Sequence, residues 1–172
     1  PYPGQIDVAK AVKQSVAGGA TAMIMSKGFL RLCAPGWNGR IGILDYLFTY
    51  AALSPDPIQQ VAISTVEEAA RIGADGVCFF VGLSTKNDPY VLELLGKVGD
   101  LCDRYGMVFA AEAEFPGFYD SQQSHLEKHG IKYLKFTARL CAELGCDFIS
   151  TNWTGDRGSF ADLVDYVKIP VV

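Results

Sequence analysis

The sequence predicts an α/β fold with a parallel sheet, and three observations support this prediction. Stretches with helical periodicity alternate with β-branched or aromatic runs along the 172 residues. In three places, 16–25, 70–82 and 142–153, a helical stretch ends at glycine and passes directly into such a run. The runs are nearly continuous in apolar residues, as is typical of strands that are buried on both faces. A parallel sheet that is flanked by helices accounts for all three observations.

Each of these units is interpreted as a helix, a tight turn and a strand, because glycine fits the left-handed position that closes a helix. The predicted strands cover 22–25, 43–50, 76–82, 107–113 and 148–153, with a further strand from Ile169, and the helices after the first cover 66–72, 89–104, 131–144 and 159–167. The segment 50–57 contains two prolines, which bias it away from helix. We expect it to form a loop that could cover the pocket.

About six strands of this kind fit either an open doubly wound sheet or part of a (β/α)8 TIM barrel. Polar residues lie at the carboxyl ends of successive strands, at 26–27, 112–114 and 151–152, where barrel enzymes hold their catalytic groups. The sequence also has no glycine-rich G-x-G-x-x-G turn for a dinucleotide. Both observations favour the barrel, which needs about 250 residues when complete. We therefore expect residues 1–172 to form a single partial barrel domain, with the first strand and the last one or two strands outside them.

Composition excludes several classes of partner. The net charge is −4, from 15 basic and 19 acidic residues, and no Lys/Arg run predicts binding to nucleic acid or to an anionic membrane. The longest apolar stretches, such as 77–83, are far shorter than the roughly 20 residues that span a bilayer. The five cysteines lie in apolar patterns without a C-x-x-C pair, so they are predicted to be buried and reduced. This cysteine usage predicts a cytoplasmic protein.

The segment 147–156 is the most informative part of the sequence. A buried strand here runs into Thr-Gly-Asp and then a helix, which places side chains 150–152 at the mouth of the fold and offers a helix start to an anion. On this segment the chain resembles the class I (Schiff-base) aldolases of the archaeal-type fructose-bisphosphate aldolase family, whose relatives include aminodideoxyheptulosonate synthase and, more distantly, deoxyribose-phosphate aldolase. Other segments agree with this resemblance in order and spacing: 18–22 with 27–28, 66–69 with 73–75, and 103–107.

The resemblance implies a lyase that makes or breaks a C–C bond in a phosphorylated sugar or related keto compound. It also implies an imine mechanism that needs no metal or organic cofactor, and a homo-oligomer. Loops after the last two barrel strands would hold the substrate phosphate, and these strands are expected outside the sequence.

Two departures from the family affect the chemistry. The resemblance places an imine-forming lysine two residues before Asn152, where this chain has Ser150. A hydroxyl forms no iminium, so it supplies no electron sink for C–C cleavage. The family's tyrosine, a proton donor or acceptor after the fifth strand, corresponds to Phe115, which has no titratable proton.

Three explanations remain open: a homologue that has lost imine chemistry, an enzyme that uses other groups in the same pocket, or an engineered variant of an active enzyme. For the second, Glu112 and Glu114 are candidates, because period-two spacing puts them on one face of a strand and burial can bring their pKa values toward neutrality. They could equally form a solvated rim or an ion pair with Lys27. Lys27 itself is either a replacement imine lysine or a salt-bridge or phosphate partner.

The remaining candidates have alternatives as well. Asn152, Trp153 and Phe115 are predicted substrate contacts, although Asn152 could instead hold the following turn and large aromatics belong mostly to cores. Ser150 could donate a hydrogen bond to a bound carbonyl or, with less support, act as a nucleophile. Asp156 is interpreted as a helix N-cap.

His125 and His129 are four residues apart in a polar segment that predicts an exposed loop or short helix. No third ligand is evident, so no metal site is predicted.

These observations predict an aldolase-like lyase whose catalytic residues come from Ser150, Glu112, Glu114 and Lys27. Two alternatives remain: a non-catalytic barrel that binds sugar phosphates, and an isomerase or lyase that works without an imine through Glu112 or Glu114.

Overall fold

A computed structural model describes residues 6–33, 41–50, 60–83, 86–116 and 122–172. Its elements, in chain order, are α1 (Val8–Ala17), β1 (Ala22–Met25), α2 (Lys27–Cys33), β2 (Gly42–Tyr46), β3 (Phe48–Tyr50), β4 (Gln60–Ala62), α3 (Val66–Ile72), β5 (Gly76–Val81), α4 (Asp88–Tyr105), β6 (Val108–Ala113), α5 (Gln122–Glu143), β7 (Phe148–Thr151) and α6 (Arg157–Val167). Among the described residues, no helix combines the length and apolar character that a membrane span requires.

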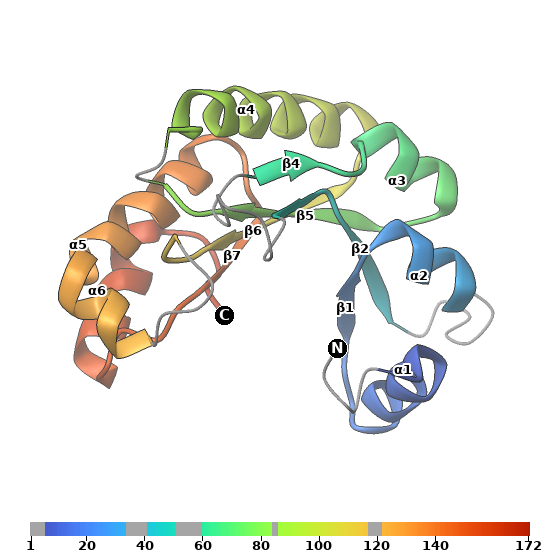
Figure 1. Ribbon diagram of the computed structural model, residues 1–172, viewed down its shortest axis with the longest axis horizontal. Coiled ribbons are helices and arrows are strands. Elements are labelled where there is room, and N and C mark those ends of the chain that lie inside the picture. Colours follow the sequence, from blue (N-terminus) through green and yellow to red (C-terminus); the bar gives the residue numbers. More distant parts are fainter. Residues whose placement is uncertain (1–5, 34–40, 51–59, 84–85, 117–121) are drawn as a thin grey trace.

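Five strands form one curved sheet in the order β1-β2-β5-β6-β7, and every neighbouring pair is parallel. A single parallel bridge between Ile149 and Val171 continues the sheet beyond β7. Figure 1 shows the helices arranged around the outer, convex side of this sheet, which leaves the opposite side as a concave inner face. The predicted α/β class and the predicted parallel sheet are confirmed.

The structure differs from the predicted elements at three places. The predicted strand 43–50 divides at Leu47, whose N–H donates to the Cys78 carbonyl while its own carbonyl accepts from Ile63 N–H. The chain thereby leaves the parallel sheet, and β3 pairs instead with β4 in an antiparallel hairpin. Helix α2 was not predicted, and α5 begins nine residues earlier than the predicted 131, with a kink at Gly130 (φ 72°, ψ 169°). Except for Tyr50, the predicted covering loop 50–57 lies outside the described residues.

The core lies between the convex side of the sheet and the helices. Phe79 and Phe109 from the sheet, with Leu95 from α4 and Leu134 from α5, are completely buried there. All five cysteines are buried, as predicted. A smaller cluster of Leu44, Cys78 and Ala110, with Tyr46 and Phe148 packed against it, lies at the inner face.

Two glycines in α4 provide a matched test of this packing. A Cβ atom at Gly99 would lie 2.5 Å from the backbone oxygen of Leu144, whereas one at Gly96 would meet no atom within 4 Å. We expect Gly96→Ala to raise the free energy of unfolding by about 0.5–1 kcal/mol, since alanine favours helix. Gly99→Ala should lower it by about 1–3 kcal/mol, since α4 must move away from that carbonyl. Urea denaturation of the full-length protein measures both, and equal effects would contradict the close approach at Gly99.

Candidate active site

Side chains on the concave face of the sheet meet at the carboxyl ends of the strands. Residues 77, 79 and 81 of β5 pack against the helices, so the alternate position Phe80 lies on the other side, the inner face. Glu112 of β6 is in register with Phe80 on one side and with Ser150 of β7 on the other. The structure therefore brings the predicted residues Glu112 and Ser150 side by side at one level of the inner face.

Tyr46, the last residue of β2, belongs to this group although the sequence did not identify it. Its register partner on β5 is Cys78, which puts the phenol on the inner face. The hydroxyl of Tyr46 donates a hydrogen bond of 2.6 Å to Oε2 of Glu112. Tyr46 lies in the middle of the predicted strand 43–50, and its contact joins residues 66 positions apart, which sequence spacing does not reveal.

Glu114 follows directly after β6 and is partly buried. Burial, and secondly the nearby charge of Glu112, raise the pKa of the Glu114 carboxyl to about 7. Both forms of this group are therefore populated at neutral pH, which suits a general acid or base. Glu112 and Glu114 together bring two carboxyl groups to the mouth of the fold.

Lys27 has a different environment from these carboxyl groups. It is the first residue of α2, and its Nζ forms an ion pair of 2.8 Å with Oε2 of Glu68 in α3. Arg31 and Arg71 approach Oε1 of the same Glu68 at 3.0 and 3.5 Å. The salt-bridge interpretation of Lys27 is confirmed, but its partner is Glu68 and not the predicted Glu112 or Glu114, because the residue belongs to the helix layer rather than to β1.

Asn152 and Thr151 connect the end of β7 to the end of β6. Oδ1 of Asn152 accepts a hydrogen bond of 2.9 Å from the N–H of Phe115, and Oγ1 of Thr151 donates one of 2.6 Å to the carbonyl of Ala113. These two bonds hold the backbone on both sides of Glu114. Asn152 is thus structural in part, although it holds the neighbouring strand end rather than the turn that follows it.

Phe115 lies in an aromatic cluster beneath α5. It is 3% exposed, and its ring lies 5.5 Å from His125, 5.9 Å from His129 and 5.6 Å from Tyr133. This placement gives Phe115 a packing role and does not support the predicted contact with substrate.

The histidine segment is helical, and Gln123, Ser124, Glu127 and Lys128 are exposed as predicted, but the predicted exposure is wrong for His125. Helix α5 buries His125 to 5% exposure, and neither of its ring nitrogens has a hydrogen-bond partner among the described residues. His125 lies among polar residues in the sequence, so its neighbours did not indicate that its helix face packs on Phe115. Within the described parts of the chain, no three His, Cys, Asp or Glu side chains form a group that could hold a metal ion.

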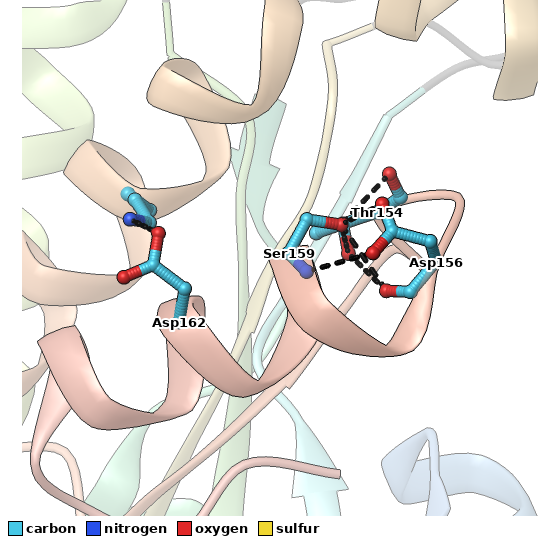
Figure 2. A network of polar contacts seen from close by, with 5 residues as sticks. Thr154, Asp156, Ser159 and Asp162 are labelled. Atoms are coloured by element: carbon cyan, nitrogen blue, oxygen red, sulfur yellow. Dashed lines mark hydrogen bonds and ion pairs between the residues drawn. The ribbon is translucent and has the colours of Figure 1, made fainter.

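The loop after β7 caps the N-terminus of α6. Figure 2 shows the side chain of Ser159 directed toward Thr154 and Asp156. Oδ1 of Asp156 accepts from Ser159 N–H at 3.0 Å, and the Ser159 hydroxyl lies 2.8 Å from Oγ1 of Thr154 and 2.7 Å from Oδ2 of Asp156. The prediction that Asp156 is an N-cap is confirmed.

Trp153 is 45% exposed and packs on Phe160, so the expectation that it belongs to the core is wrong. Its contact with substrate stays a prediction.

A cavity of about 610 Å³ lies at the opposite, amino ends of β6 and β7. Its lining includes the acidic residues Asp100, Asp103, Glu143 and Asp147. Barrel enzymes hold their chemistry at the carboxyl ends of the strands, and Asp147 already accepts a 2.7 Å hydrogen bond from Phe109 N–H. We therefore place the candidate active site at Tyr46, Glu112, Glu114 and Ser150.

Comparisons with known proteins show which family the chain resembles over its length. Residues 2–172 match the profile of the DeoC/LacD family aldolases. The chain is 29% identical over 171 residues to the 2-amino-3,7-dideoxy-D-threo-hept-6-ulosonate synthase of Halobacterium salinarum, which covers 98% of this chain and 61% of that protein. It is 26% identical over 152 residues to the 2-amino-4,5-dihydroxy-6-oxo-7-(phosphonooxy)heptanoate synthase of Streptomyces griseus, which covers 87% of this chain and 53% of that protein.

The solved structure of an archaeal fructose 1,6-bisphosphate aldolase superposes with a TM-score of 0.83 at 19% identity, over 99% of this chain and 65% of that one. A second archaeal structure, which holds a carbinolamine intermediate on its catalytic lysine, gives a TM-score of 0.84. The predicted barrel architecture is thereby confirmed: the described sheet is a half-barrel, and the chain spans between 53% and 65% of the length of these proteins.

Proposed function

The chain belongs to the DeoC/LacD family of aldolases, and from this premise we propose that its protein is a lyase that makes or breaks a C–C bond in a phosphorylated sugar or related keto compound without a lysine imine on β7. The observation that supports this proposal most directly is the composition of the inner face. Ser150 lies beside Glu112 where the family resemblance places the imine-forming lysine. The described acid–base groups there are Glu112, Glu114 and Tyr46.

Aldol cleavage without an imine requires a base and an acid. The Glu112 carboxylate takes the proton from the substrate hydroxyl, and the C–C bond breaks. The electron pair of that bond moves toward the adjacent carbonyl. Protonated Glu114 then gives its proton to the carbon of the resulting enolate. The hydroxyl of Ser150 is a candidate donor to the substrate carbonyl oxygen, where negative charge develops. Acid–base groups of this kind contribute typically about 10²–10⁴-fold to the rate.

The same carboxyl pair supports one other reaction class. A group with a pKa of about 7, such as Glu114, can also remove and return a proton next to a carbonyl, which is the step of an isomerase. The identity of the product separates the two reactions, since a lyase yields two fragments and an isomerase only one product. The predicted homo-oligomer and cytoplasmic location stay predictions.

The proposal is tested on the full-length protein with fructose 1,6-bisphosphate and deoxyribose 5-phosphate, with and without borohydride, followed by product analysis and intact mass. We expect the substrate to split into two products, no loss of activity on borohydride treatment and no adduct on any lysine. Ser150→Lys is the positive control, because it restores an amine at the family position and should form a trappable adduct.

Three outcomes would contradict the proposal. A borohydride-stable adduct of the wild-type protein on Lys27 or another lysine would establish a relocated imine enzyme. A single rearranged product would establish the isomerase. Binding of these sugars without turnover would indicate a non-catalytic barrel.

A further inference from the structure

The contact between Tyr46 and Glu112 joins two strands that are not neighbours. Tyr46 lies on β2 and Glu112 on β6, and β5 lies between them in the sheet. The register partners Tyr46, Cys78 and Ala110 mark one level of the inner face, and Glu112 lies two residues further along β6. The phenol therefore reaches across β5 to meet Oε2 of Glu112 at 2.6 Å.

This hydrogen bond distinguishes two carboxyl groups that are otherwise alike. Glu112 and Glu114 are two residues apart, on the inner side of the same strand and its extension. Glu112 receives a donated hydrogen bond from Tyr46, whereas no donor among the described residues reaches the carboxyl of Glu114. Hydrogen bonding to a carboxylate favours its ionised form, and a like charge nearby disfavours ionisation of the second group. Burial and the nearby charge of Glu112 raise the pKa of the Glu114 carboxyl, so its environment favours the protonated form of Glu114.

The other groups that face this pair do not reverse the asymmetry. Cys78 of β5 lies below it, and burial, together with the charges of Glu112 and Glu114, raises the pKa of its thiol, so it stays neutral. The neighbouring position on β7 is the uncharged Ser150. The cation of Lys27 is paired with Glu68. Among the described residues of the inner face, Tyr46 is therefore the group that contacts Glu112 but not Glu114.

We propose that Tyr46 is a positioning residue that assigns opposite roles to the two carboxyl groups: it holds Glu112 as the carboxylate that accepts the substrate proton and leaves Glu114 as the group that holds the proton to be donated. This inference rests on the proposed function for its catalytic consequence, but the distribution of charge is a property of the protein alone. The tyrosine that the family resemblance places at Phe115 is absent here, and Tyr46 supplies a phenol from a different strand.

The experiment uses Tyr46→Phe in the full-length protein, which removes one hydroxyl and keeps the ring. Tyr133→Phe is the matched control, because the Tyr133 hydroxyl donates to the backbone carbonyl of Leu83 and, among the described residues, forms no hydrogen bond to a carboxyl group. Side-chain carboxyl signals of 13C-labelled glutamate are titrated by NMR, with Glu112 and Glu114 assigned through their glutamine variants. In Tyr46→Phe, the two titrations should move closer together by about one pH unit, and in Tyr133→Phe they should stay in place.

Kinetics provide the second measurement. We expect Tyr46→Phe to lower kcat by about 10–100-fold with KM within about threefold, because the Glu112 carboxylate loses the hydrogen bond that positions it. Unchanged titrations in Tyr46→Phe, or equal changes in Tyr133→Phe, would overturn the inference, even if Glu114→Gln abolishes activity and the proposed function stands. If instead the protein has no lyase activity, the proposed function fails, and the titrations still decide whether Tyr46 sets the charges.

Discussion

Replacing Glu114 by glutamine in the full-length protein is expected to lower kcat/KM by about 10²–10⁴-fold, the range for loss of a general acid. Glu114→Gln keeps the size of the side chain but can neither hold nor give the proton. Because the pKa of Glu114 is raised to about 7, the wild-type rate should fall as pH rises through that value, where the acid loses its proton. The remaining activity of the variant should lack this alkaline limb.

Glu112→Gln tests the base and should remove the acidic limb, since the rate no longer depends on keeping that carboxylate ionised. Glu93→Gln is the matched control, because Glu93 is exposed on α4 and, within the described part of the chain, pairs with Lys97. Its profile should equal that of the wild type. Substrate depletion measured from pH 5 to pH 9 provides all four profiles. Retained activity in the double variant Glu112→Gln/Glu114→Gln would rule out carboxylate chemistry at this site.

Most of the fold could be predicted because its strands are apolar runs and its helices have helical periodicity. Helix α3 has the predicted bounds 66–72, and the parallel strands follow the predicted apolar runs closely. Strand β4 has three residues, which carry too little periodicity to predict it. Helix α2 was missed although, like α3, it has seven residues. The division of the strand at Leu47 depends on hydrogen bonds to residues 63 and 78, which sequence spacing does not reveal.

The candidate site was predicted as far as strand periodicity determines it. Period-two spacing placed Glu112 and Glu114 on one face, and the rule that chemistry lies at strand ends identified Ser150. Lys27 comes after the last strand residue, so its direction is set by the helix that it begins, and the strand pattern does not predict its pairing with Glu68. The role of Tyr46 depends on a contact across an intervening strand, which no local pattern encodes.

Phe79→Ala is expected to lower the free energy of unfolding by about 3–5 kcal/mol, as for other large aromatic side chains removed from a packed core. Phe79 is completely buried at the centre of the sheet, and its ring centroid lies 4.0 Å from that of Phe48, so it also attaches the β3–β4 hairpin to β5. Phe136→Ala is the control, because that side chain is 61% exposed on α5 and its removal should change stability by less than about 0.5 kcal/mol.

The alternation of side chains along β5 leads to a second prediction for the same variant, which concerns its kinetics. Phe79 packs on the helix side, while its neighbour Phe80 lies on the inner face in register with Glu112. Phe79→Ala should therefore reduce stability while kcat and KM per folded molecule stay near the wild-type values at low temperature. Urea denaturation and kinetics on the same preparation measure both. A loss of kcat without a loss of stability would mean that Phe79 acts on the site directly, which would contradict the division of the sheet into a structural outer face and a chemical inner face.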